Sequence, residues 1–256
     1  MKPHIHVGPL ILGSYSICMT IALLVSAHAL NLNLKRHKIQ HVVSASVLAS
    51  VLGFCGLIGA RSYYLLFEAR AGLSVTEWLS GNGLTWLGGF IAGLGIVVVW
   101  TIRCRIPPLV FLDILSVPTA LAYGIGRIGC LMAGDGDYGI PTRLPWGMRF
   151  PNGTIPTLEA VHPTPIYEFV ASVVIAIWLW RRGRSSTAGV CTTEYLILSG
   201  LSRFVVEFIR RNPAVLAGLT NAQVVSVAEV ISGIALAVWI RNKRQTIRVA
   251  SNVSGF

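Results

Sequence analysis

Long apolar stretches alternate with short polar segments along the whole chain. Several of these stretches are about 20 residues long, which is the length that a helix needs to cross the hydrocarbon core of a bilayer. A helix is suited to that core because it satisfies its own backbone hydrogen bonds. The pattern predicts seven spans at about 7–30, 41–67, 84–102, 108–132, 165–180, 190–209 and 222–240.

The polar segments between the spans differ in kind. Residues 68–82 are amphipathic and contain Trp78, which predicts an arm on the membrane surface. Residues 133–162 form the longest polar insert and predict a small head outside the membrane. Neither a long linker nor an internal repeat interrupts the sequence. We therefore expect an all-α membrane protein, in which residues 1–256 form one domain of about seven transmembrane helices with a small extracytoplasmic head.

Composition supports a polytopic membrane protein. Hydrophobic residues make up 54% of the chain and charged residues 12%, whereas a soluble domain carries about twice that charge. The net charge of +11 does not indicate nucleic acid as a partner, because the basic residues gather in short loops between apolar stretches. The five cysteines form no C-x-x-C pair, so we expect packed thiols and no disulfide framework.

The basic clusters also predict the orientation of the chain. They follow the first, third, fifth and seventh spans, and the cytoplasmic side of a membrane protein carries the excess of lysine and arginine. The clusters are Lys35, Arg36 and Lys38; Arg103 and Arg105; Arg181, Arg182 and Arg184; and Arg241, Lys243, Arg244 and Arg248. We expect the amino terminus and residues 133–162 outside and the carboxyl terminus in the cytoplasm.

Ionisable residues at membrane depth are the candidate chemistry. Arg127 lies among glycines near the end of the fourth span, and neither i±3 nor i±4 holds an acid. A charged residue costs about 2.5 kcal/mol or more at the centre of a membrane helix, so it needs a partner and usually has a function. Arg203 and Glu207 are four residues apart, and Arg210 extends the same helix face.

Two interpretations of these charges follow from the residues alone. In the first, the arginines and acids form an internal salt bridge that holds the bundle together. In the second, arginines from different helices converge on a phosphate, and the acids orient them. Arginine suits the second role because it stays charged and offers a planar fork of donors.

A set of short motifs then resembles a known family. In chain order the motifs are Gly126-Arg127-Ile128-Gly129, Gly134-Asp135, Tyr138-Gly139, Leu144-Pro145-Trp146-Gly147, His162-Pro163-Thr164-Pro165-Ile166-Tyr167-Glu168 and Arg203-Phe204-Val205-Val206-Glu207-Phe208. Gly59-Ala60-Arg61 and Gly88-Gly89 also match in order. Together these motifs resemble the bacterial prolipoprotein diacylglyceryl transferase family. The resemblance implies a seven-span enzyme of the bacterial inner (plasma) membrane that moves the diacylglyceryl group of phosphatidylglycerol to the lipobox cysteine of a preprolipoprotein signal peptide, releasing glycerol 1-phosphate.

The resemblance also implies roles for individual residues. Arg127 and Arg203 are expected to bind the phosphodiester and stabilise the departing phosphate, and Glu207 is expected to orient Arg203. The thiol proton passes to His162, Asp135 or Asp137, among which the sequence does not choose. The remaining substrate-binding candidates are Arg61, Tyr15, Gly129, Gly139, Tyr167 and Glu168. We expect no cofactor and no metal ion.

The chain departs from the family pattern at three positions. Leu87 stands where the family usually has histidine, Cys130 where it has asparagine, and Asp135 where it has glutamate. Two alternatives to the family activity therefore stay open. One is a transferase with a different acceptor, and the other is a lipid-binding or lipid-transport protein without enzymatic activity, built on the same glycine-rich helices and buried arginines.

The charge asymmetry predicts where an impermeant reagent reaches the chain. In intact spheroplasts, Asn152→Cys should be labelled by an impermeant thiol reagent above the level of the unsubstituted chain, because residue 152 belongs to the expected outer head. Arg184→Cys, in an expected cytoplasmic loop, should be labelled only after lysis. Labelling at position 184 and not at position 152 would invert the topology.

Overall fold

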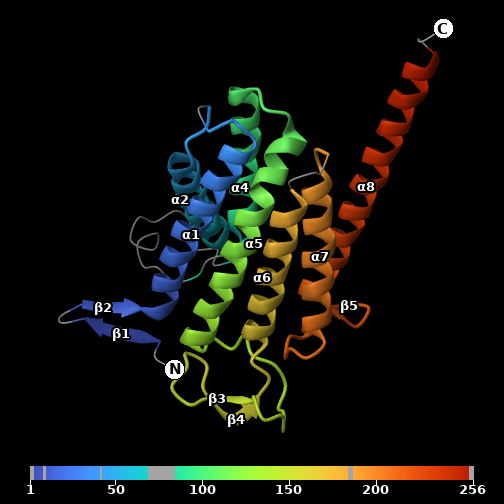
Figure 1. Ribbon diagram of the computed structural model, residues 1–256. Coiled ribbons are helices and arrows are strands. Elements are labelled where there is room, and N and C mark those ends of the chain that lie inside the picture. The colour runs from blue at the N-terminus through green and yellow to red at the C-terminus, as the bar shows by residue number, and fades with distance from the viewer. Residues whose placement is uncertain are drawn as a thin grey trace. The chain divides into compact units, whose positions relative to one another are not determined.

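Seven α-helices make up most of the part of the chain that the computed structural model describes, which comprises residues 3–7, 10–40, 42–68, 83, 85–183 and 187–253 (Figure 1). Their bounds are α1 Ser14–Arg36, α2 Ala45–Tyr63, α4 Trp86–Cys104, α5 Pro108–Ala133, α6 Thr164–Arg182, α7 Val190–Glu207 and α8 Asn221–Val253. One π-helical turn, η1 (Tyr64–Glu68), continues α2.

Six of these helices are long and apolar enough to cross a membrane. The exception is α7, because its 18 residues include Glu194, Arg203 and Glu207. Within the described residues, the prediction of a helical membrane protein is confirmed: seven helices are present, and six of them are long and apolar enough to span. Many of their large apolar side chains, such as Phe54 and Ile102, are exposed on the protein surface, as expected of helices that face lipid.

The structure corrects the first predicted span. Val7 and residues 10–13 are not helical: β1 (His4–Val7) and β2 (Leu10–Gly13) pair antiparallel, and the helix begins only at Ser14. The sequence between the two strands is Gly-Pro, a dipeptide that favours a turn and disfavours a helix interior. The apolar residues around it misled the prediction, because apolar content alone does not distinguish a strand from the start of a helix.

Other boundaries shift less. The predicted spans 165–180 and 190–209 correspond to α6 and α7, whereas α8 continues well past the predicted end at residue 240. The predicted surface arm at 68–82 falls, apart from Glu68, outside the described residues.

Residues 133–162 contain a small antiparallel sheet, β3 (Met148–Phe150) and β4 (Thr157–Val161). A third hairpin, β5 (Ala214–Leu216) with β6 (Leu219–Thr220), follows α7.

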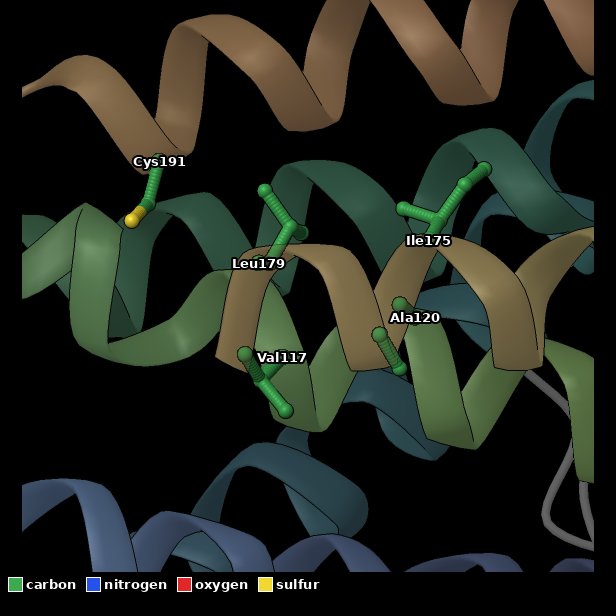
Figure 2. Packing of buried hydrophobic residues seen from close by; sticks show 6 residues of the cluster. Val117, Ala120, Ile175, Leu179 and Cys191 are labelled. Atoms are coloured by element: carbon green, nitrogen blue, oxygen red, sulfur yellow. The ribbon is translucent and has the colours of Figure 1, made fainter. Parts of the chain in front are cut away.

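The contacts divide the chain into two compact units, which are described separately: Met1–Ser26 with Leu115–Phe256, and Ala27–Ile114. The boundaries fall inside α1 and α5, and the expectation of a single domain stays a prediction. In the first unit, side chains of α5, α6 and α7 pack against one another, and Figure 2 labels five of the six that it draws. They are Val117, Ala120, Ile175, Leu179 and Cys191. The sheet between α5 and α6 has its own core of Tyr138, Phe150 and Val161.

Glycine lets α2 and α4 cross closely in the second unit. A side chain at Gly88 would collide with the backbone carbonyl of Gly59, so the two helices are in backbone contact there. At Gly93 the space around the Cα is open. The close crossing is formed by Gly88 and Gly59, because they face each other where the helices meet.

This crossing yields a prediction with a matched control. Gly88→Ala should lower the thermal unfolding temperature in detergent, because the added methyl group meets rigid backbone and overpacking costs about 1–3 kcal/mol. Gly93→Ala adds the same methyl group to the same helix in open space, and it should leave the unfolding temperature unchanged or raise it slightly. Equal unfolding temperatures for the two variants would contradict the close crossing.

Candidate functional site

Three arginines and three carboxylates form one ion-pair network in the first unit. They come from the end of α5, the start of α6, the end of α7 and the segments just beyond, and these helix ends lie together in Figure 1. The members are Arg127, Asp137, Glu168, Arg203, Glu207 and Arg210. Their formal charges cancel, three against three, which is how a cluster of charges is tolerated inside a protein.

Glu168 is the centre of the network. Its side chain is 1% exposed, and its Oε1 accepts hydrogen bonds from Arg203 Nη1 and, at 2.6 Å, from Tyr123 Oη. Its Oε2 lies 3.2 Å from Arg210 Nη1 and 3.7 Å from Arg127 Nε. A single carboxylate thus contacts guanidinium groups carried by two helices and by the segment after α7. A buried carboxylate without such partners would be strongly unfavourable.

Asp137 bridges two of the same arginines from the segment after α5. Its Oδ2 pairs with Arg127 Nη1 and its Oδ1 with Arg210 Nη2. Burial alone would raise the pKa of the Asp137 carboxyl, but the charges of Arg210 and Arg127 outweigh burial and lower that pKa. The opposite holds for Asp135, whose pKa is raised by burial and by the neighbouring negative charge of Asp137.

Glu207 is the last residue of α7 and holds the other side of the network. Its Oε2 lies 3.3 Å from Arg203 Nη2 and 3.6 Å from Arg210 Nε. Its Oε1 accepts hydrogen bonds from Asn212 Nδ2 at 2.5 Å and Thr220 Oγ1 at 2.9 Å. The predicted i, i+4 pair of Arg203 and Glu207 is therefore present. The sequence placed Arg210 on the same helix face, and this prediction is wrong because α7 ends at Glu207.

His162, Tyr167 and Trp146 form a second polar group beside the small sheet. Trp146 Nε1 donates to Tyr167 Oη at 2.8 Å, and Tyr167 Oη lies 3.2 Å from His162 Nδ1. Tyr167 Oη can accept from Trp146 and donate to His162 Nδ1 at the same time, so one hydroxyl links the indole and the imidazole.

Two of the predicted glycines allow close approach of other groups. The backbone N–H of Gly139 donates to the carbonyl of His162 at 2.8 Å, and a Cβ there would lie 2.9 Å from the His162 Cβ. Gly139 also bridges Arg210 in an antiparallel backbone contact. A Cβ at Gly129 would lie 3.1 Å from Tyr15 Cδ2, so the predicted residues Gly129 and Tyr15 are in contact. Both glycines thus bring neighbouring segments against the arginine network.

Arg61 is the one predicted site residue that belongs to the second unit. It is buried, its Nη1 donates to the Gly83 carbonyl at 2.8 Å, and its guanidinium carbon lies 5.6 Å from the centre of the Tyr64 ring. These contacts give Arg61 a local structural role. Its predicted role in substrate binding stays a prediction.

Cys130 and the two aspartates after α5 lie close enough together to be considered as metal ligands. The potential ligand atoms of Cys130, Asp135 and Asp137 lie within 4.8 Å of one another. Both carboxylate oxygens of Asp137, however, already contact guanidinium groups. The positive charge of two adjacent arginines opposes a bound cation, so these residues do not fit a metal site.

The sequence did not single out three residues that complete the network. The guanidinium carbon of Arg127 lies 4.8 Å from the centre of the Tyr123 ring, one helical turn away, so the i−4 spacing was an available signal. Asn212 and Thr220 bind Glu207 from beyond the end of α7. No spacing in the sequence relates these two residues to Glu207, because the turn after the helix sets their positions.

The comparisons with known proteins agree on one family. The family model described as prolipoprotein diacylglyceryl transferase matches residues 3–239. Relatives named phosphatidylglycerol–prolipoprotein diacylglyceryl transferase include one from Clostridium tetani, 31% identical over 76% of this chain and 79% of the relative. One from Finegoldia magna is 34% identical over 75% of this chain and 76% of the relative. One from Synechococcus elongatus is 28% identical over 95% of this chain and 88% of the relative.

Glu168→Gln tests the central position of that carboxylate. The substitution keeps the shape and removes the charge that three arginines share, so it should lower the free energy of unfolding by about 3–5 kcal/mol. The measurement is thermal or denaturant unfolding in detergent. Glu194→Gln is the control, because Glu194 pairs with the half-exposed Arg182 and should cost about 1 kcal/mol or less. Similar losses from both variants would rule out a special role of Glu168.

Proposed function

The chain belongs to the prolipoprotein diacylglyceryl transferase family, and we propose that its arginine network is the site that transfers the diacylglyceryl group of phosphatidylglycerol to the lipobox cysteine of a preprolipoprotein, the first step of lipoprotein maturation. One observation carries this assignment. Arg127 from α5 and Arg203 from α7 both contact the same carboxylate of Glu168. Two guanidinium groups from different helices therefore converge on one anionic position, as phosphodiester binding requires.

The burial of the arginines divides their roles. The side chains of Arg127 and Arg203 are 20% and 21% exposed, whereas that of Arg210 is 4% exposed. The two partly exposed groups are accessible to an incoming lipid phosphate. Arg210 forms ion pairs with Asp137, Glu168 and Glu207, and it holds these acids in place. The network is thus preorganised: its buried part fixes the two arginines that meet the ligand.

The reaction follows from this placement. The sulfur of the lipobox cysteine attacks the glyceryl carbon that bears the phosphate, so a C–S bond forms while the C–O bond to phosphate breaks. The electron pair of the broken bond goes to the phosphate oxygen of the departing glycerol 1-phosphate. Arg127 and Arg203 stabilise that growing negative charge, and such preorganised donors are often the largest catalytic contribution.

Asp135 is the best of the three candidates for removing the thiol proton. A base with a raised pKa holds the proton more readily, and burial together with Asp137 raises the pKa of Asp135. Asp137 is less suitable because two arginines lower its pKa. His162 has its Nδ1 engaged by Tyr167 and is not a member of the ion-pair network. We assign the base to Asp135 and a positioning role to Asp137.

The distribution of charge along the helices supports a site on the outer side of the membrane. In the first unit, the network lies at the end where α6 begins and α7 ends. The other end of α6 carries Arg181 and Arg182, and α8 carries Arg241 and Lys243 after its apolar part. Basic residues mark the cytoplasmic side, so the network, the β3–β4 sheet and the amino terminus belong outside, and the end of α8 inside.

Substitutions of Arg127 test the proposed function. Arg127→Lys keeps the charge but loses the fork of donors, and we expect poor transfer with normal folding. Arg127→Ala should lower the transfer rate by about 100-fold or more. The measurement is transfer from labelled phosphatidylglycerol to a lipobox peptide in membranes with matched amounts of protein.

Arg182→Ala is the matched control. Arg182 forms an ion pair with Glu194, is half-exposed and has no contact with the network, so this variant should retain the wild-type rate. A wild-type rate from Arg127→Ala would refute the phosphate-binding role and, with it, the proposed function of the network.

A further inference from the structure

The hairpin after α7 exposes apolar side chains at the arginine end of the helix. Ala214 pairs with Thr220 and Leu216 with Leu219. The two turn residues between the strands, Ala217 and Gly218, have positive φ angles of 48° and 80°, as in the tight turns that suit the twist of a hairpin. All three residues of β5 are exposed, with Val215 at 61% and Leu216 at 62%.

An exposed apolar face also runs along α7, the helix that precedes the hairpin. Leu201, Val205 and Phe208 follow one another at i, i+4 and i+7, and all three are exposed large hydrophobic residues. The helices before and after α7 in the chain, α6 and α8, are apolar enough to cross the membrane. An outward apolar face on α7 therefore contacts lipid. Val215 and Leu216 lie in the connection between α7 and α8, and β5 contacts α8, which is apolar enough to cross the membrane.

We propose that the β5–β6 hairpin is a lipid anchor, which inserts Val215 and Leu216 among the acyl chains of the leaflet on the arginine side. The hairpin is suited to this position because the paired strands satisfy part of their own backbone hydrogen bonds. The segment just before the hairpin is polar and contacts the protein: Arg211 Nη2 lies 3.5 Å from Glu159 Oε2 in the β3–β4 sheet. The hairpin therefore has one apolar edge for lipid and a polar base toward the protein.

The base of the hairpin is tied to the arginine network. Asn212 precedes β5 and Thr220 ends β6, and both donate to Oε1 of Glu207. The other oxygen of Glu207 faces Arg203 and Arg210. The two ends of the hairpin thus meet at one carboxylate, so anchoring the tip in lipid holds Glu207 beside the site. This inference concerns a contact with the bilayer and stands independently of the transfer reaction.

Photo-crosslinking tests the anchor directly. The variant Leu216→p-benzoylphenylalanine, in nanodiscs of phosphatidylglycerol, should form lipid adducts that mass spectrometry detects. The control variant Asn152→p-benzoylphenylalanine places the same group at an exposed polar turn between β3 and β4. We expect roughly tenfold more adduct at position 216, because the same large apolar group lies among acyl chains there and in water at position 152.

The outcome does not depend on catalysis. The same adducts are expected in the Arg127→Ala background, so loss of the proposed function leaves the test intact. Leu216 is exposed, and an unchanged unfolding temperature of the variant in detergent confirms that the fold is kept. Equal adduct yields at positions 216 and 152, or no lipid adduct at position 216, would overturn the anchor.

Discussion

The charge of Glu168 is buried where α5, α6 and α7 come together, and a buried charge has to be paired. Three guanidinium groups and the hydroxyl of Tyr123 surround this one carboxylate. Because the arginines start from α5, from α7 and from the segment after α7, the pairing fixes how these helix ends meet. Removal of any one partner leaves an uncompensated charge in a low-dielectric region, which is why the network acts as a unit.

The balance of charge in the network has a consequence for ligand binding. Three arginines face three acids, so an entering phosphodiester brings one negative charge in excess. Arg127 and Arg203 can meet it because their side chains are partly exposed, while Arg210 and Glu207 remain buried. The acids then serve as the structural counter-ions that keep both guanidinium groups in place before the ligand arrives. Such preorganisation avoids reorganisation of the site during the reaction.

The three residues that depart from the family pattern lie in different surroundings. Cys130 is buried, and its sulfur lies 4.0 Å from Arg127 Nη1, so a thiol lies next to the arginine that we propose for phosphate binding. Asp135 is a shorter acid than the family glutamate, yet burial and Asp137 still raise its pKa. Leu87 belongs to the second unit, near the start of α4, and contributes no titratable group. The carboxyls after α5 therefore become the centre of the proposed proton transfer.

Features that depend on local spacing could be predicted from the amino-acid sequence. Apolar stretches of membrane length predicted the helices, and the i, i+4 spacing of Arg203 and Glu207 predicted their pair, because both follow from the geometry of one helix. The acids that Arg127 contacts could be identified only from the folded chain: Asp137 is 10 residues away along the sequence, and Arg210 reaches that same aspartate across 73 residues. The same holds for Asn212 and Thr220 at Glu207, and for the hairpin that replaces the predicted start of the first span. Such contacts depend on how helix ends and turns pack in space, and no periodic pattern along the chain encodes that packing.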